Sequence, residues 1–254
     1  DALNLLADYV LMARLMADRE FRAEMRWGMD AMAQGFERIR DVAWNYRDAL
    51  TDTQIKGVID RLNAPKLRLD RLVLPKADRV AAEQVLEEVF VARQGPDPDK
   101  FGATMARLSA KDRPLMLFGE SARWQTAATG HANTFDTTDA VADVYGGWEY
   151  RWNLPQFDKI LEQPSDYERL EISKFPMVET VLAPVGKLLQ ARWKLQAEAA
   201  ATRAGLGVLA FQRRTKPWPA EQAPTRPTYV RALARDPWSR ANKTFVYFLP
   251  RRRA

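Results

Sequence analysis

The strongest constraint on the fold is a run of apolar or small side chains that recur every three or four residues through the first fifty positions. They are Leu6, Val10, Ala13, Ala17, Phe21, Met25, Gly28, Met32, Phe36, Ile39 and Ala43. This spacing is that of one face of an amphipathic α-helix. The sequence therefore predicts one long helix here, or two helices with a bend near Gly28 or Gly35.

A second stripe with the same period lies nearer the C-terminus. It comprises Leu182, Val185, Leu189, Trp193, Ala197, Ala200, Ala204, Val208 and Phe211. Pro184 should kink this helix or mark its true start, because proline lacks the backbone N–H that a helix interior uses. Two long apolar faces need partners, so we expect a mainly α protein: a multi-helix bundle with a long C-terminal helix.

Start and stop signals place further helices between the stripes. "TDTQ" at residues 51–54 has the spacing of a capping box and predicts a helix that ends near Leu62, before Pro65. Residues 76–94 have helix-forming composition until "QGPDPD" breaks the pattern. In that break Asp97 or Asp99 is expected to cap the next helix rather than to bind a hard cation.

After "TKPWP" the composition changes to proline, arginine and turn residues. "DPWS" at residues 236–239 favours a turn, and residues 244–249 alternate as a strand does, with residues 228–233 as the nearby candidate partner. We therefore expect a small antiparallel β element that caps the long helix, with Trp238 in its core. The predicted organisation is a helical region over 1–174 and a helix-plus-β module over 175–254, with one continuous domain as the alternative.

This ending resembles a known family. A long Ala-rich helix, then "PWP" at 217–219, "LARDPWS" and an aromatic-rich strand are similar to the tail of type II secretion pseudopilins. The same tail after amphipathic helices resembles a group of uncharacterised helical proteins common in planctomycetes. The sequence departs from pseudopilins at Lys216 and Ser239, where the family has glycine, and it holds no N-terminal membrane helix. The resemblance implies a packing module rather than an activity.

The positive charge is concentrated in the tail. The net charge is +6, yet from Arg203 onward there are 12 Lys or Arg against 2 Asp or Glu. Such asymmetry is typical of a surface for an acidic partner, and also of a merely solvated face. The residues expected to bind a partner are Arg251, Arg252, Arg253, Arg240 and Trp238. Other protein subunits are the expected partners, with an anionic lipid or acidic polymer surface as an addition and nucleic acid disfavoured.

The chain offers little for catalysis. It has no cysteine and one histidine, His131, whose polar setting favours a structural or solvated role. No catalytic, cofactor-binding or metal-binding residue is predicted. Tyr145, Trp148 and Trp152 would share one face of a helix, where they would form core or, alternatively, a platform for a sugar.

The hypothesis that follows is a non-enzymatic structural or assembly subunit of a larger complex. The sequence begins at Asp1 in helical rhythm, which suggests a preceding segment that could tether it to a membrane or carry it out of the cytoplasm; the compartment stays open. One alternative is a carboxylate-based enzyme acting on a polysaccharide. The other is nucleic-acid binding through the basic tail, which combines charge with aromatic side chains.

Overall fold

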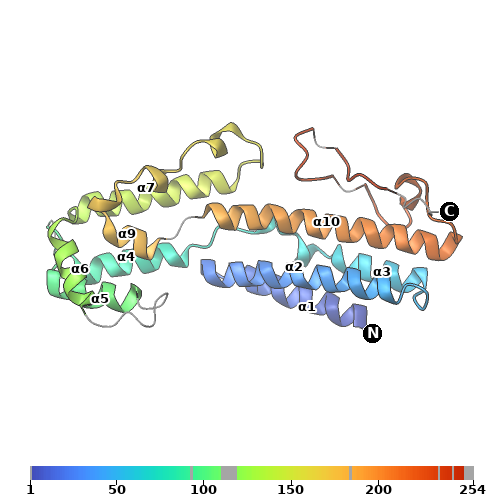
Figure 1. Ribbon diagram of the computed structural model, residues 1–254, viewed down its shortest axis with the longest axis horizontal. Helices are drawn as coiled ribbons and strands as arrows, with labels where there is room; N and C mark the ends of the chain where they lie inside the picture. Colours follow the sequence, from blue (N-terminus) through green and yellow to red (C-terminus); the bar gives the residue numbers. More distant parts are fainter. Residues whose placement is uncertain are drawn as a thin grey trace. The chain divides into compact units, whose positions relative to one another are not determined.

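A computed structural model describes residues 2–91, 94–109, 119–182, 185–233, 235–241 and 243–248. Within these ranges the protein is mainly helical, as the sequence predicts, and no strand is present. The helices form two compact units. Unit 1 comprises residues 1–19, 23–73 and 188–254, and unit 2 comprises residues 20–22 and 74–187. Figure 1 draws both units.

Unit 1 contains three helices from the N-terminal part of the chain and the long C-terminal one. They are α1 (Ala2–Ala17), α2 (Arg22–Asn45), α3 (Asp52–Leu62) and α10 (Gly186–Thr215), with 3₁₀ turns η1 (Pro65–Leu67), η2 (Leu69–Arg71) and η5 (Ala223–Thr225). The first stripe thus forms two helices, and the break falls at residues 18–21 rather than at Gly28 or Gly35. Phe21 lies in this break and is 48% exposed, whereas Val10, Met32 and Ile39 are fully buried.

Gly28 lies inside α2 and does not mark a bend. It lies where α1 and α2 approach each other closely. A Cβ at this position would lie 2.3 Å from the backbone N of Ala17 and 2.7 Å from the carbonyl O of Ala13. Only a residue without a Cβ permits this backbone-to-backbone contact. The glycine therefore determines how closely α1 and α2 pack.

Helix α10 joins unit 1 through polar contacts with α2 and the loop that follows it. Arg40 Nη1 donates to Thr202 Oγ1 at 2.7 Å and lies 2.8 Å from Glu198 Oε2. Arg213 Nε donates to the carbonyl O of Leu50 at 3.0 Å. The helix begins two residues after Pro184, which itself lies outside the described residues. Because α10 packs with helices from the first 73 residues, the two units do not meet at the boundary expected between residues 174 and 175.

Unit 2 is built from shorter helices. They are α4 (Ala77–Val89), α5 (Pro98–Ser109), α6 (Glu120–Thr129), α7 (Thr134–Trp152), α8 (Asp166–Arg169) and α9 (Pro176–Val181), with 3₁₀ turns η3 (Lys159–Glu162) and η4 (Ile172–Lys174). Helix α5 begins at a cap, since Asp97 Oδ1 accepts from the N–H groups of Asp99 and Lys100. In unit 1 the capping box is confirmed: Thr51 and Gln54 each accept from the other's backbone N–H.

The expected antiparallel β cap is not seen in the described part of the tail. One isolated bridge joins Arg235 and Thr244, and residues 245–248, the last that the structure describes, belong to no strand. Trp238 is half exposed and does not form the core that we expected. Alternation by itself cannot create a strand, because two or three short segments must also bury an apolar face together.

Candidate docking surfaces

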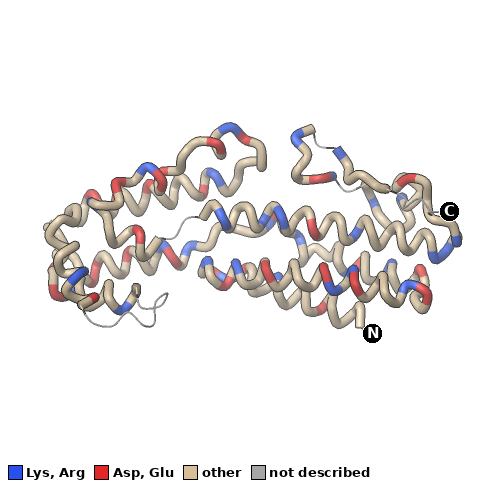
Figure 2. The backbone as a smooth tube through the Cα atoms, in the orientation of Figure 1, with Lys and Arg blue, Asp and Glu red and all other residues tan. Residues whose placement is uncertain are grey.

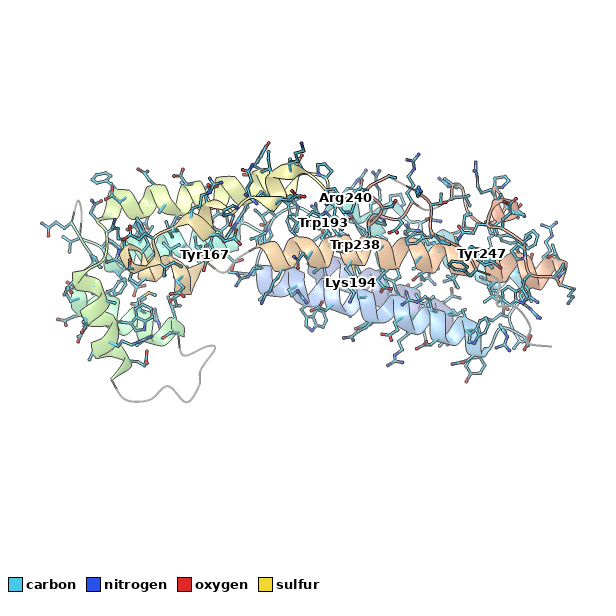
Figure 3. The ribbon with its side chains drawn as sticks, turned by 45° about the horizontal axis from the view of Figure 1, so that its top comes forward. Tyr167, Trp193, Lys194, Trp238, Arg240 and Tyr247 are labelled. Carbon is cyan, nitrogen blue, oxygen red and sulfur yellow. The ribbon has the colours of Figure 1, made fainter. Side chains whose placement is uncertain are left out.

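The "DPWS" turn forms as the sequence predicts. Asp236 Oδ1 accepts from the N–H of Trp238 at 2.9 Å, and Asp236 O accepts from the N–H of Ser239 at 3.0 Å. The turn presents Trp238, 50% exposed, and Arg240, also exposed, on the surface of the tail (Figure 3). The other expected partner-binding residues, Arg251, Arg252 and Arg253, lie outside the described residues.

The tail is held to unit 1 upstream of this turn. Thr225, Tyr229 and Val230 are each at most 8% exposed. The Tyr229 hydroxyl donates to Asp52 Oδ2 at 3.0 Å, and burial raises the pKa of this phenol. Part of the basic charge is also used within the unit, because Arg213 Nη2 donates to the carbonyl O of Asp48. Figure 2 shows further basic positions gathered where α10 ends, which is where cations interact favourably with the helix dipole.

A second surface lies on the outer side of α1, and sequence reasoning missed it. Leu5, Met12 and Leu15 are 69%, 47% and 59% exposed, although the opposite face of the same helix is buried. At about 100° per residue these three positions fall within one arc of roughly 80°. Between them lies Asp8, whose carboxylate pairs with Arg61. The signal was present in the sequence, because apolar side chains occur on both faces of this helix.

Two exposed tryptophans meet near the end of α2. The rings of Trp44 and Trp218 have centroids 6.1 Å apart, and the guanidinium of Arg47 lies 4.6 Å from the centre of the Trp44 ring. Trp44 is 54% exposed and Trp218 37% exposed. The "PWP" motif of the tail thus packs on α2 and leaves aromatic surface in solvent.

The aromatic stripe of α7 is core and not a platform. Tyr145, Trp148 and Trp152 are at most 6% exposed. The Trp148 ring packs against Tyr145 at 5.2 Å and against Tyr167 at 5.7 Å between centroids. Burial raises the pKa of Tyr145, since the charged phenolate would lose its solvation. The polysaccharide hypothesis loses the feature that motivated it.

His131 has a structural role in unit 2. Its Nδ1 lies 2.9 Å from the carbonyl O of Ala132, and its Nε2 accepts from the N–H of Met177 at 3.4 Å. The ring is 8% exposed and packs edge-on against Phe90 and Phe101. Burial lowers the pKa of His131 and favours the neutral ring that these two hydrogen bonds require. The histidine therefore orients the start of α9 and is not free to act as a base.

Two further features concern metals and membranes. Among the described residues, no group of three or more acidic or histidine side chains is placed to hold a metal ion. Nor does any helix in the described ranges combine the length and apolar character that crossing a membrane requires.

Comparison with known proteins returned no relationship. No protein-family model matches the chain, and neither a curated protein nor a solved structure matches it significantly. The resemblance to the pseudopilin tail and to the planctomycete group is thus neither supported nor opposed, and it stays a prediction.

Proposed function

We propose that this chain is a non-enzymatic structural or assembly subunit of a larger protein complex, and that the outer face of α1 docks on a neighbouring chain. The supporting observation is the exposure of Leu5, Met12 and Leu15 on a helix whose other face is already buried. A helix that is apolar on nearly every side is normally covered on every side. Covering it would remove apolar surface from water at the partner's contact.

The free energy gained by burying this face of α1 is large enough to contribute to binding a partner. Burying a leucine side chain fully is worth about 1.5–3 kcal/mol, so Leu5 and Leu15, each more than half exposed, would contribute roughly 1–2 kcal/mol apiece. The exposed pair of Trp44 and Trp218 lies on the same unit and offers the residue type most often found at the centre of protein interfaces. These are the properties of a surface for apolar association rather than for catalysis.

The test is the native mass of the particle that contains this chain, purified from its source in mild detergent, with identification of stoichiometric partners. The mild detergent releases a membrane-anchored complex into solution without separating its subunits. Replacing Leu5 and Leu15 with glutamate together should release the partner, because two charges would be desolvated at the contact. A stoichiometric complex that survives this double substitution would contradict docking through α1.

A matched control separates docking from general surface change. Met12→Glu and Val80→Glu introduce the same charge at helix positions of nearly equal exposure, 47% and 49%. Met12 lies on the proposed face, whereas Val80 lies on α4 of unit 2. The proposal requires that the first substitution weaken association and that the second leave it unchanged.

The basic tail is tested separately. Reversing the charge of Arg251, Arg252 and Arg253 should weaken association and reduce its dependence on salt, if these residues meet an acidic partner. Unchanged association would remove the tail from the interface and leave α1 as its basis.

A further inference from the structure

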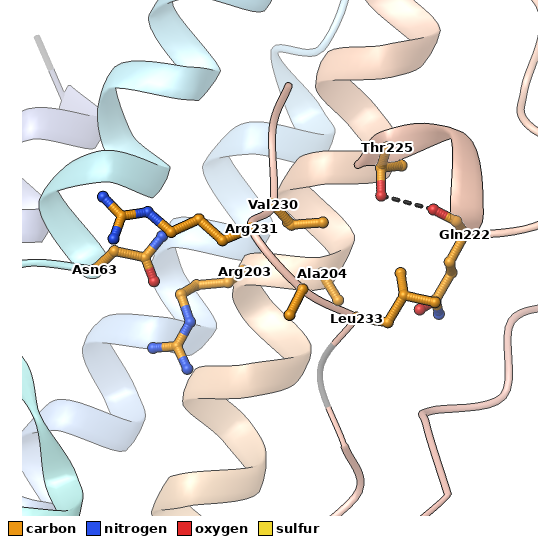
Figure 4. Close-up of a pocket in the computed structure, with 9 residues that line it drawn as sticks. Asn63, Arg203, Ala204, Gln222, Thr225, Val230, Arg231 and Leu233 are labelled. Atoms are coloured by element: carbon orange, nitrogen blue, oxygen red, sulfur yellow. Dashed lines mark hydrogen bonds between the residues drawn. The ribbon is translucent and has the colours of Figure 1, made fainter. Parts of the chain in front are cut away.

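A cavity of about 260 Å³ lies in unit 1, between the end of α3, helix α10 and tail residues 222–233 (Figure 4). Its wall is in part apolar, formed by Ala204, Val230 and Leu233. Asn63, the C-cap residue of α3, lies at the opposite side. The proposed docking face of α1 contributes no residue to this cavity.

Two arginines from different elements line this cavity. Arg203 extends from α10 and Arg231 from the tail, and Figure 4 shows both reaching to the side where Asn63 lies. Neither guanidinium has a hydrogen bond or ion pair with any residue that the structure describes. No aspartate or glutamate lines this cavity. Two guanidinium groups thus lie at this cavity, and no carboxylate among its lining residues offers a counter-charge.

An acidic group in a neighbouring hollow is already paired. Asp70 lines a neighbouring hollow that also touches Arg203. Its carboxylate is held by Arg68, whose Nε donates to Oδ1 at 3.1 Å and whose Nη2 contacts Oδ2, and this bonding lowers the pKa of Asp70. Burial lowers the pKa of Arg203, and no carboxylate opposes that effect. An anion that enters the cavity would meet an unpaired and partly desolvated guanidinium.

We propose that this cavity binds the oxyanion of a small organic molecule, a phosphate or a carboxylate, between Arg203 and Arg231, with the apolar part of the molecule against Val230 and Leu233. Guanidinium groups bind both kinds of oxyanion through paired N–H donors, and Asn63 offers an amide as a further donor. A cavity of this size holds a single small ligand and not a peptide or a nucleic-acid strand.

The tail backbone next to the cavity is held in place by packing and hydrogen bonds. Gly207 lets the tail cross α10 closely, since a Cβ there would lie 2.9 Å from Val230 Cγ1. Thr225 Oγ1 donates to the carbonyl O of Gln222, and Tyr229 is bonded to Asp52. Arg231 follows directly after this anchored stretch. The backbone that carries Arg231 is therefore held in place before any ligand binds, which reduces part of the entropic cost of binding.

The experiment is thermal-shift and calorimetric titration of the full chain with phenyl phosphate, inorganic phosphate and benzoate, at constant ionic strength. We expect a saturable rise in melting temperature with at least one of the three probes. Arg203→Met and Arg231→Met should each weaken binding by about ten-fold or more, since a charge-assisted hydrogen bond is lost. Arg203→Lys keeps the charge but loses the paired donors, so it should bind more weakly than the parent protein.

The control is Lys194→Met, which removes one positive charge from an exposed position of the same helix, about 13 Å along the axis from Arg203. It should bind the probes as the parent does. Binding of the phosphate probes alone would identify a phosphate ligand, and binding of benzoate as well would extend the site to carboxylates. No saturable shift with any probe, or an equal loss in the Lys194→Met protein, would overturn the proposal. Arg231 is exposed, so its variant provides a test even if the Arg203→Met protein folds poorly.

Discussion

Replacing Gly28 with alanine tests the closest contact in unit 1. A new Cβ would lie 2.3 Å from the N of Ala17, 2.7 Å from the O of Ala13 and 2.8 Å from the Cα of Ala17. Ordinary contact needs about 3.5 Å or more, and all three neighbours are backbone atoms that cannot rotate away. Helix α1 would have to move off α2 by roughly 1 Å, which exposes the residues packed between them.

The expected change in the free energy of unfolding combines two opposing effects. Overpacking a well-packed core costs about 1–3 kcal/mol, and a clash with rigid backbone belongs at the upper end of that range. Alanine recovers about 1 kcal/mol, because it loses less conformational entropy than glycine in a helix. We therefore expect Gly28→Ala to lower the free energy of unfolding by roughly 2 kcal/mol, which for a chain of this size lowers Tm by about 4–8 °C.

The chain supplies its own control for this substitution. Gly57 lies inside α3, is exposed, and, apart from its chain neighbours and its own helix backbone, has no atom within 4 Å of the place where an added Cβ would lie. Gly57→Ala should therefore stabilise the protein by about 1 kcal/mol through helix propensity alone. Urea unfolding followed by circular dichroism gives the two free energies, and hydrogen exchange of the α1 amides locates the effect. If both substitutions stabilise equally, α1 and α2 are not in backbone contact at Gly28.

Three further outcomes follow from the structure. Lys216 has a positive φ of 75° just after α10 ends, so Lys216→Gly should raise the free energy of unfolding by about 0.5–1 kcal/mol in urea, and a loss would contradict the left-handed conformation. Trp148→Ala should cost about 3–5 kcal/mol, whereas Tyr150→Ala, at a 56% exposed position of the same helix, should change stability by less than about 0.5 kcal/mol. The lowered pKa of His131 means that the unfolded chain binds a proton more readily, so stability is full above about pH 6.5 and falls as the pH drops below it. His131→Gln should reduce that slope in unfolding measured against pH, and an unchanged slope would show that another group causes it.

Local rules in the sequence predict much of the helical content. The capping box at Thr51 and the Asp97 cap depend on residues only three or four apart, and both form as expected. The apolar stripe likewise identifies Val10 and Ile39 as core, because helical spacing places them on one face whatever that face packs against. Such signals need no knowledge of distant residues.

Contacts between distant residues decide the rest. Spacing identifies Gly28 as special but cannot tell a bend from a close helix contact, which depends on where Ala13 and Ala17 lie. The alternation after Lys243 predicts a strand, yet a strand also needs partners to pair with, and in the described tail one bridge is all that forms.

The candidate surfaces, like the fold, depend in part on local sequence signals and in part on contacts between distant residues. By itself the sequence determined a mainly helical protein with a basic tail, because hydrophobic period, capping and charge are read from neighbouring residues. Only the tertiary structure decided that the aromatic stripe of α7 is core, that Leu5 and Leu15 stay exposed, and that Arg203 and Arg231 share one cavity. Burial and convergence depend on which elements pack together, and no local pattern carries that information.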